Sequence, residues 1–288
     1  MNVVIIGSGF GIYGYLPSLI DCAEKIYLNK RYKKKIIKKI KDKLLTRIKI
    51  RKIIWYTDIN LIIKKINFIV IAQNPSNQHS LILKLTNKIK TKNLFLEKPL
   101  SNNPNNALKL IKVLHKRKIN FSIAFIFKYL KWYKFIYNNL SSKNKFTLLW
   151  KIKINKQNNS WKYSISEGGG LLRFYGIHFI RLLFDLNFTK LINKKIKKNQ
   201  LHLNFLDKKE NNILIKILFS KQNKFIMNFN GKKVFTGPNP FLKPINKNNE
   251  PRINIIKNYI KEKLIDYHTD FNNEKKFILF WKKIERDK

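Results

Sequence analysis

Short apolar runs alternate with segments of helical character over the first 122 residues of the chain. Runs rich in apolar and β-branched residues predict six strands, at Val3–Ile6, Lys25–Leu28, Ile53–Tyr56, Phe68–Ala72, Asn93–Leu96 and Phe121–Phe125. The segments between them predict helices: one through about Cys22, a basic amphipathic one at 33–44, and others at Asn60–Lys65, Gln78–Leu85 and from Pro104. This alternation predicts a parallel sheet with helices on both faces, that is, a doubly wound α/β domain over residues 1–122.

The remainder of the chain, residues 123–288, has a different pattern. Alternating or β-rich runs predict strands at Phe146–Ile154, Leu201–Leu206, Ile213–Phe219 and Lys224–Phe229. Helices are expected at Leu171–Phe184 and Glu274–Arg286, and a loop rich in Pro, Asn and Gly at Thr236–Pro251. Hairpin-like spacing of the strands is typical of an antiparallel or mixed sheet. We therefore expect an α+β second domain with a largely antiparallel sheet.

Composition narrows the class of protein. Of the 288 residues, 44% are hydrophobic, which is enough to bury a core and argues against intrinsic disorder. No run approaches the roughly 20 apolar residues of a membrane-spanning helix, and Val3–Ile6 follows no basic segment, so we interpret it as a buried strand and not as a signal peptide. Cys22 is the only cysteine, which excludes an internal disulfide and is typical of a reducing compartment. These features favour a cytoplasmic protein without a membrane segment.

The formal net charge of +45 raises the question of nucleic-acid binding. Only eight of the 61 basic residues are arginine, the side chain that pairs bidentately with phosphate and guanine. The lysines are spread over the whole length together with abundant Asn and Ile, and in the densest run Ile36, Ile37, Ile40 and Leu44 form an apolar face opposite them. We therefore expect no specific nucleic-acid partner, although a binder of nucleic acid or of acidic surfaces stays open as the less favoured alternative.

The first predicted strand leads into Gly7-Ser8-Gly9-Phe10-Gly11. Glycines between a strand and a helix let the backbone turn tightly and approach a pyrophosphate, which the helix N-terminus then binds. The third glycine of the usual G-x-G-x-x-G pattern would stand at Ile12. The context predicts a dinucleotide-binding Rossmann domain, against the alternative of a purely structural turn.

The end of the second strand bears on the choice of cofactor. Twenty residues after Gly9 come Asn29, Lys30 and Arg31, where an NAD site usually has a carboxylate on the ribose hydroxyls. Either cation suits a 2′-phosphate, and Arg31 is the more informative because arginine is scarce in this chain. The sequence therefore favours NADP over NAD.

Polar residues also follow the fourth and fifth strands, at the edge where ligands bind in open α/β sheets. They include Gln73-Asn74-Pro75 and Glu97-Lys98-Pro99. With the glycine turn and with Glu167-Gly168-Gly169-Gly170 leading to His178, these motifs resemble the Gfo/Idh/MocA oxidoreductase family. On the motifs and the resemblance, the expected cofactor contacts are Gly7, Gly9, Phe10, Gly11, Ile12, Asn29, Lys30, Arg31, Ala72, Gln73, Asn74, Pro75, Gln78, Glu97 and Lys98.

The resemblance implies a nicotinamide cofactor in the first domain and a polyhydroxy substrate, such as a sugar or nucleotide-sugar, against the second. It implies that Lys98 touches cofactor and substrate, that His178 meets the substrate oxygen, and that Lys128, Gly169 and Gly170 line the substrate site. Hydride transfer at a carbon bearing oxygen requires a matching proton transfer, which Lys or His can supply. Members often pair through the open face of the second sheet, so a homo-oligomer is expected.

Two positions depart from the family pattern. Members often carry aspartates four residues before and three residues after the histidine, and here these are Phe174 and Arg181. Tyr175 is the candidate substitute proton donor, and Lys128 stands where relatives often have arginine. The departures keep open a cofactor-binding protein without dehydrogenase activity.

Structural alternatives exist for the same residues. His178 and Tyr175 suit a packed helix face, Lys98 a solvated surface, and the three glycines a simple turn. The scattered histidines and the single cysteine suggest no metal site.

Overall fold

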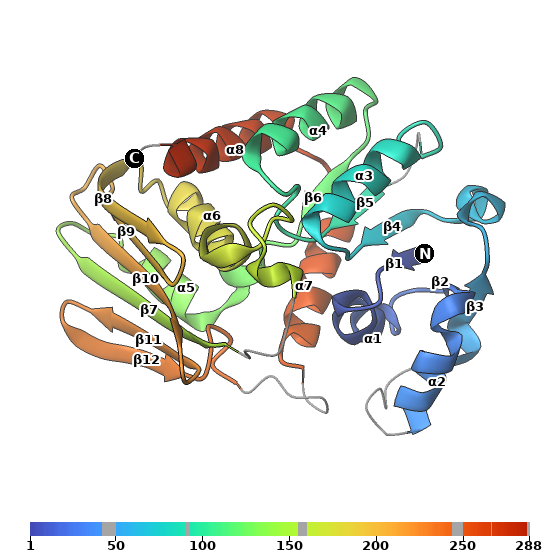
Figure 1. The fold of residues 1–288 in the computed structure, drawn as a ribbon, viewed down its shortest axis with the longest axis horizontal. Helices are drawn as coiled ribbons and strands as arrows, with labels where there is room; N and C mark the ends of the chain where they lie inside the picture. The colour runs from blue at the N-terminus through green and yellow to red at the C-terminus, as the bar shows by residue number, and fades with distance from the viewer. Residues whose placement is uncertain (42–49, 90–92, 155–159, 244–249, 266, 287–288) are drawn as a thin grey trace. The chain divides into compact units, whose positions relative to one another are not determined.

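The computed structural model describes residues 1–41, 50–89, 93–154, 160–243, 250–265 and 267–286. The chain forms two compact units (Figure 1). The first unit comprises residues 1–124 and 245–276, and the second unit comprises residues 125–244 and 277–288. The domain ranges expected from the sequence, 1–122 and 123–288, are each one continuous stretch of chain. The two units are defined by contacts within the structure, and residues 245–276 belong to the first unit.

The first unit is built on a six-stranded sheet in the order β3-β2-β1-β4-β5-β6, in which every pairing is parallel. The strands are β1 (Asn2–Ile6), β2 (Lys25–Asn29), β3 (Ile53–Tyr56), β4 (Phe68–Ile71), β5 (Asn93–Leu96) and β6 (Phe121–Ile123). The central strands are buried almost throughout, as both-face coverage by helices requires. The predicted doubly wound sheet is therefore confirmed, and the order reverses between β1 and β4, where open α/β sheets bind their ligands.

Two helices of the first unit begin at an asparagine side-chain cap. Asn74 accepts a hydrogen bond from Asn77 N (2.8 Å) before α3 (Pro75–Leu85), and Asn103 accepts one from Asn106 N (2.9 Å) before α4 (Pro104–Lys116). In both helices proline occupies the first position, where its missing N–H is harmless. The predicted start of α3 at Gln78 was therefore too late, because the cap lies at Asn74.

Other local predictions need correction. The helix after the glycine turn consists of a π-helical turn at Gly11–Tyr15 and α1 (Leu16–Leu19), and it ends before Cys22. The expected helix at 60–65 is two short 3₁₀ turns, Ile59–Leu61 and Ile63–Lys65. The basic helix α2 (Lys33–Lys41) does bury Ile36, while Leu44 lies outside the described residues.

The segment that follows the second unit completes the first. Part of the predicted loop at 236–251 lies outside the described residues, and beyond it α7 (Arg252–Ile265) packs on the glycine-turn helix. Ser18 Oγ donates to Ile253 O (2.9 Å), and Tyr259 Oη donates to Ser122 Oγ (2.7 Å). Thr269 bonds both the N–H and the C=O of Phe121 (2.6 and 2.7 Å). The edge strand β6 is thereby held by residues almost 150 positions later in the chain.

The second unit contains a six-stranded sheet in the order β12-β11-β7-β10-β9-β8. Its strands are β7 (Lys145–Lys153), β8 (Lys190–Lys197), β9 (Gln200–Leu206), β10 (Asn212–Ser220), β11 (Lys224–Phe229) and β12 (Lys232–Gly237). Only β7 and β10 pair in parallel, and the other pairings are antiparallel. The largely antiparallel sheet is confirmed, but β8 and β12 were not predicted.

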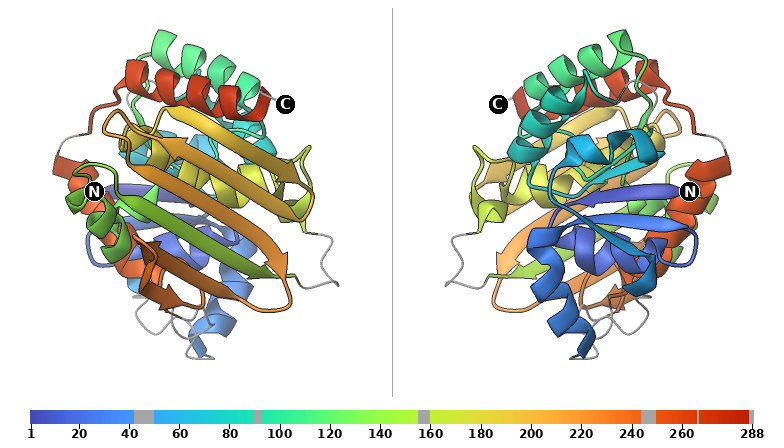
Figure 2. Two further views of the ribbon diagram at one scale, coloured as in Figure 1. Left: turned by 90° about the vertical axis from the view of Figure 1, so that its left-hand side faces the viewer. Right: turned by 90° about the vertical axis from the view of Figure 1, so that its right-hand side faces the viewer.

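Helices of the second unit cover one face of this sheet (Figure 2). They are α5 (Lys131–Asn138), α6 (Ile177–Asp185) and the second part of α8 (Phe271–Arg286). The predicted helix at 171–184 divides into a π-helical turn, Leu171–Gly176, and α6. The side chains facing these helices are buried, for example Phe146, Ile215 and Leu203.

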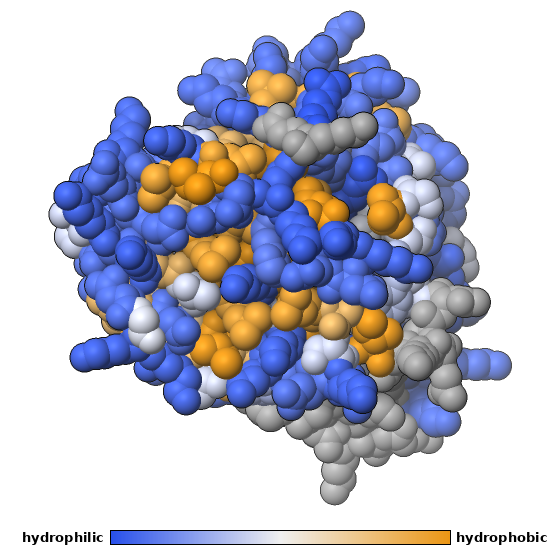
Figure 3. Space-filling view, turned by 60° about the vertical axis from the view of Figure 1, so that its left-hand side comes forward, coloured by the Kyte–Doolittle hydropathy of each residue, from blue (hydrophilic) through white to orange (hydrophobic). Residues whose placement is uncertain are grey.

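The other face, which we call the outer face, carries no helix among the described residues of this unit (Figure 2, left). One row across it runs Ile226, Leu149, Lys216, His202, Lys195. Apolar side chains are interspersed with polar ones on the surface that includes this face (Figure 3). None of the six strands contains an aspartate or a glutamate, so the face is cationic as well as partly apolar.

Candidate functional site

The glycine turn lies at the carboxyl end of β1, beside the end of β4. Gly7 has φ +141°, and a Cβ there would lie 2.1 Å from Ala72 O, so only glycine lets the two strand ends approach this closely. A Cβ on Gly9 would meet nothing within 4 Å, and Ser8 and Gly9 are exposed. The turn therefore combines a tightly packed base with an accessible backbone, which is the geometry that a diphosphate needs.

Two residues of the turn have side chains engaged within the protein. Ile12 is fully buried, and its N–H donates to Gly9 O (3.0 Å). Phe10 packs over Gly14, where a Cβ would lie 2.3 Å from the ring, and the Arg252 guanidinium lies 4.2 Å from the centre of the same ring. Arg252 in turn forms a bidentate pair with Glu250, with both contacts at 2.6 Å. Arg252 was not predicted as a site residue, because its contact with Phe10 joins residues far apart in the chain.

The end of β2 presents cations without a carboxylate. Asn29 accepts a hydrogen bond from Arg31 N (3.1 Å), which fixes the turn into the next helix. Lys30 and Arg31 are exposed, and Arg31 Nη2 donates to Tyr32 Oη at 2.6 Å. This arrangement leaves positive charge at the position where a ribose or a 2′-phosphate would bind.

At the ends of β4 and β5 the expected residues come together. Ala72 and Pro75 are buried, and Gln73 and Asn74 are half-buried. Gln78, one turn into α3, is fully buried, and its amide is hydrogen-bonded to the backbone around Glu97. The side chains of α3 and the turn after β5 thus form one packed group at the carboxyl edge of the sheet.

Glu97 and Lys98 begin the turn after β5, and the Lys98–Pro99 peptide bond is cis. Burial raises the pKa of the Glu97 carboxyl, while the charge of Lys98, the neighbouring Tyr15 hydroxyl and the charge of Arg252 act in the opposite direction. Tyr15 is itself fully buried, and burial together with the Glu97 charge raises the pKa of its hydroxyl. The Glu97 carboxyl therefore lies within the electrostatic influence of a phenol and two cations, Tyr15, Lys98 and Arg252.

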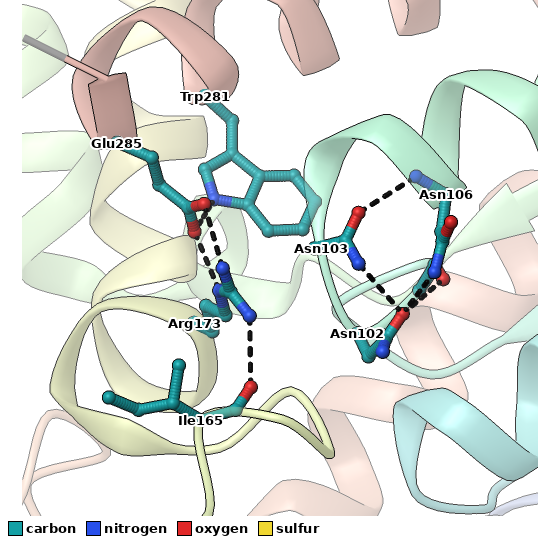
Figure 4. Close-up of polar contacts among 8 residues, drawn as sticks. Asn102, Asn103, Asn106, Ile165, Arg173, Trp281 and Glu285 are labelled. Atoms are coloured by element: carbon teal, nitrogen blue, oxygen red, sulfur yellow. Dashed lines mark hydrogen bonds and ion pairs between the residues drawn. The ribbon is translucent and has the colours of Figure 1, made fainter.

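In the second unit the triple glycine forms a tight turn. A Cβ on Gly169 would lie 2.2 Å from Trp161 O, and Gly170 has φ +84°. Arg173, in the next turn, donates from Nε and Nη2 to the two carboxylate oxygens of Glu285 (2.8 and 3.1 Å) and from Nη1 to Ile165 O (2.9 Å). Trp281 Nε1 also donates to Glu285 (3.0 Å), as Figure 4 shows. The glycine segment is thereby tied to α8.

Figure 4 also shows a local network at the start of α4 in the first unit. Asn102 Oδ1 accepts hydrogen bonds from Asn103 Nδ2 (3.3 Å) and Asn106 Nδ2 (2.8 Å). These amides fix the end of the segment that follows Pro99.

His178 and Tyr175 lie among aromatic rings. The His178 ring, 7% exposed, stacks on Phe127 at 4.3 Å and meets Phe125 edge-on. Tyr175 packs edge-to-face on Trp150 (5.3 Å), and burial raises the pKa of its hydroxyl, with the nearby Tyr163 acting in the same direction. Lys128 is half-buried, with its Nζ 4.9 Å from the Tyr129 ring. All three belong to the second unit, whereas Lys98 belongs to the first, so their roles in substrate binding stay predictions.

The two positions that depart from the family pattern have local partners. Phe174 lies edge-on to Trp161 (5.1 Å) and 5.6 Å from Lys162 Nζ. Arg181 pairs with Asp185 (2.8 Å) and lies 4.9 Å from the Phe277 ring. Both side chains are thus integrated into the packing of the second unit.

No group of three or more His, Cys, Asp or Glu that could hold a metal ion occurs among the residues that the structure describes. In the same part of the chain, no helix is long and apolar enough to cross a membrane.

A family model described as an oxidoreductase family with an NAD-binding Rossmann fold, GFO_IDH_MocA, matches residues 1–125. No curated protein matches the sequence.

Solved structures share the fold over nearly the whole chain. The WlbA (WbpB) dehydrogenase from Thermus thermophilus, in complex with NAD and UDP-GlcNAcA, is 11% identical, with a TM-score of 0.73, over 100% of this chain and 95% of that one. KijD10, a 3-ketoreductase from Actinomadura kijaniata in complex with NADP and TDP-benzene, is 12% identical (TM-score 0.68; 97% and 95%).

A super-repressor mutant of Gal80p from Saccharomyces cerevisiae is also similar, with 11% identity and a TM-score of 0.69, over 99% of this chain and 95% of that one. At these identities the likeness shows the two-part fold alone. The first 125 residues, with their parallel sheet and glycine turn, match the model of the GFO_IDH_MocA oxidoreductase family, which is described by its NAD-binding Rossmann fold.

Proposed function

We propose that this protein is an NAD(P)-dependent oxidoreductase that transfers a hydride between the nicotinamide and a polyhydroxy substrate, such as a sugar or a nucleotide-sugar. The observation that carries the proposal is the glycine turn at the carboxyl end of β1. Gly7 packs against Ala72, while the backbone at Gly9 stays open to a ligand. The donor set fits a dinucleotide, because exposed backbone and nearby cations suit its phosphates.

The chemistry divides between a hydride and a proton. The bound nicotinamide supplies or accepts the hydride. Lys98, beside the buried Glu97, is the proposed group for the proton at the substrate oxygen, and His178 is the proposed second one. Tyr175 is the proposed alternative proton donor, because a phenol keeps its proton at neutral pH, although burial raises its pKa and so makes it a weaker acid.

We further propose a preference for NADP. Asn29, Lys30 and Arg31 provide two cations and no carboxylate at the end of β2. A carboxylate there would repel a 2′-phosphate, whereas a guanidinium can pair with it.

A second candidate function is cofactor binding without dehydrogenase activity. Phe174 and Arg181, which stand where relatives have aspartates, are held by Trp161 and Asp185. A proton relay through aspartates at those positions is absent from this chain. The similarity in fold to a Gal80p super-repressor accords with such a role.

The remaining expectations stay proposals. The resemblance implies a homo-oligomer formed through the outer face, where Leu149, Leu214, Leu218 and Ile226 are half-buried, although the lysines around them oppose pairing at low salt. On the same basis we propose a small-molecule substrate, no specific nucleic-acid partner and a cytoplasmic location. The proposed substrate contacts are Lys128, Gly169 and Gly170.

Fluorescence titration with NADPH and NADH tests the proposal. At about 0.3 M salt, where non-specific attraction of lysines to phosphate is weak, we expect saturable binding of both, with NADPH the tighter. Arg31→Leu should weaken NADPH binding about tenfold, the effect of losing about 1.4 kcal/mol, and leave NADH binding unchanged. The control is Lys34→Ala, an exposed cation on α2.

Two results would argue against parts of the proposal. If neither nucleotide binds saturably, the oxidoreductase reading is lost. If both bind but no sugar or keto-sugar is turned over, the cofactor-binding alternative is favoured.

A further inference from the structure

Gln78 has a fully buried side-chain amide that contacts the turn containing Lys98, both before and after that lysine. Its Nε2 donates to Glu97 O (2.7 Å), and to Pro99 O and Leu100 O (3.3 Å each). Its Oε1 accepts from Glu97 N (3.1 Å). One side chain of α3 therefore bonds the backbone immediately before and after Lys98.

The turn needs these bonds because it leaves the sheet. Up to Glu97, whose N–H also donates to Ile71 O (3.1 Å), the backbone follows the ladder with β4. Beyond it, the carbonyls of Glu97, Pro99 and Leu100 converge on the Gln78 amide. Buried carbonyls without a donor destabilise the structure. An apolar side chain at position 78 would leave three such carbonyls to find other partners.

The amide has its hydrogen-bonding groups engaged within the protein. Two N–H donors serve three carbonyl oxygens, and the amide oxygen accepts from a backbone N–H. The sequence predicted Gln78 as a cofactor contact. The Gln78 side chain has no exposed surface. A direct hydrogen bond to a cofactor would therefore require the amide to break one of its bonds within the protein.

We infer that Gln78 is a positioning residue, which fixes the backbone of residues 97–100 and thereby the place from which the Lys98 side chain projects. The role of Lys98 in this inference rests on the proposed function. The claim that Gln78 fixes the backbone of residues 97–100 is independent of that function. It distinguishes a residue that acts through Lys98 from one that binds the nucleotide.

The test compares Gln78→Met, which keeps the length and shape of the side chain, with Thr86→Val. Thr86 is a buried polar residue at the other end of α3, and its hydroxyl donates to Leu83 O (2.8 Å), away from the turn. Limited acetylation at about pH 8, below the ordinary lysine pKa of about 10.4, is followed lysine by lysine by mass spectrometry. The other lysines serve as internal references, and urea unfolding shows that each variant is folded.

In Gln78→Met we expect the acetylation rate of Lys98, relative to the reference lysines, to change about fivefold or more, the factor produced by about 1 kcal/mol. Thr86→Val should leave it unchanged. Any loss of NADPH affinity in Gln78→Met should accompany the change at Lys98, because Glu97 and Lys98 are themselves expected cofactor contacts.

Unchanged Lys98 reactivity in folded Gln78→Met would overturn the inference. So would a loss of NADPH affinity without a change at Lys98, which would make Gln78 a cofactor contact. If Gln78→Met does not fold, Gln78→Glu keeps the acceptor for Glu97 N–H and removes the donors, and it is read in the same way. If the protein without substitutions binds no nucleotide, the proposed function fails. The acetylation comparison still decides the role of Gln78.

Discussion

Neighbouring glycines in the turn after β1 have separate physical roles. Gly7 adopts φ +141° with Ala72 O in the space of a Cβ, so its requirement is structural. Gly9 has open space where a Cβ would lie, so the protein alone does not require glycine there. A ligand that approaches the backbone would require glycine at this position.

This division predicts opposite effects of one substitution at the two positions. Gly7→Ala should lower the free energy of unfolding by about 2–4 kcal/mol, because of backbone strain and a clash with backbone atoms. Gly9→Ala should change it by less than about 1 kcal/mol, yet weaken NADPH binding at least about tenfold. Urea unfolding and fluorescence titration measure both quantities on both variants. Equal stability of the two variants would contradict the packing argument.

Residues with local signatures were accessible from the sequence, and residues with tertiary roles were not. The glycine turn and Glu97-Lys98-Pro99 each follow a recognisable strand. The hydrogen bonds of Gln78 and the stacking of Arg252 on Phe10 join separate elements, and no spacing along the chain encodes them. The scarcity of arginine was the one signal that could have drawn attention to Arg252.

Elements of the second unit depend on partly buried polar contacts. Glu285 on α8 accepts from Arg173 and Trp281, and Arg173 also bonds Ile165 O, which lies just before the triple glycine. The Arg173 and Glu285 side chains are 20% and 14% exposed. By contrast, Lys143 and Glu210, 4.0 Å apart, are 80% and 69% exposed.

Breaking the partly buried pair should therefore cost more than breaking the exposed one. Glu285→Gln is expected to lower the free energy of unfolding by about 2 kcal/mol, because it removes a bidentate acceptor from a shielded guanidinium. Glu210→Gln, the matched control, should cost less than about 0.5 kcal/mol. The comparison uses urea midpoints at one salt concentration. A similar loss in both variants would show that the Arg173 network adds little.

Elements were predictable where apolar runs were clean. All six strands of the parallel sheet were predicted, because each is a short run bounded by turn residues. β8 was missed because lysines obscure its alternation at an edge of the sheet. α7, which begins at Arg252 directly after the loop predicted at Thr236–Pro251, was not predicted.

At the scale of the whole molecule, the net charge of +45 is the dominant electrostatic feature. Like charges repel one another in the compact state, and the six strands of the second sheet contribute lysines without any acidic residue. With 16 Asp and Glu against 61 Lys and Arg, ion pairs such as the one between Lys257 and Asp21 (2.8 Å) compensate only locally.

Screening should therefore stabilise this protein. Raising NaCl from about 0.01 M to about 0.1 M shortens the Debye length from about 30 Å to about 10 Å, and we expect a higher melting temperature. An uncharged osmolyte at equal osmolality is the control for general solvent effects. A melting temperature that falls or stays constant with salt would show that self-repulsion does not limit stability.

Because residues 245–276 belong to the first unit, this unit can be completed only late in synthesis of the chain. A ribosome makes all six parallel strands within the first 123 residues, but the partners of Phe121 and Ser122 follow only at Thr269 and Tyr259. Until then the edge strand β6 and the glycine-turn helix lack the covering that α7 and its flanking residues supply. The second unit is thus complete in sequence, apart from the end of α8, before the first can close. The nascent first unit therefore keeps this flank uncovered until Tyr259 and Thr269 have been synthesised.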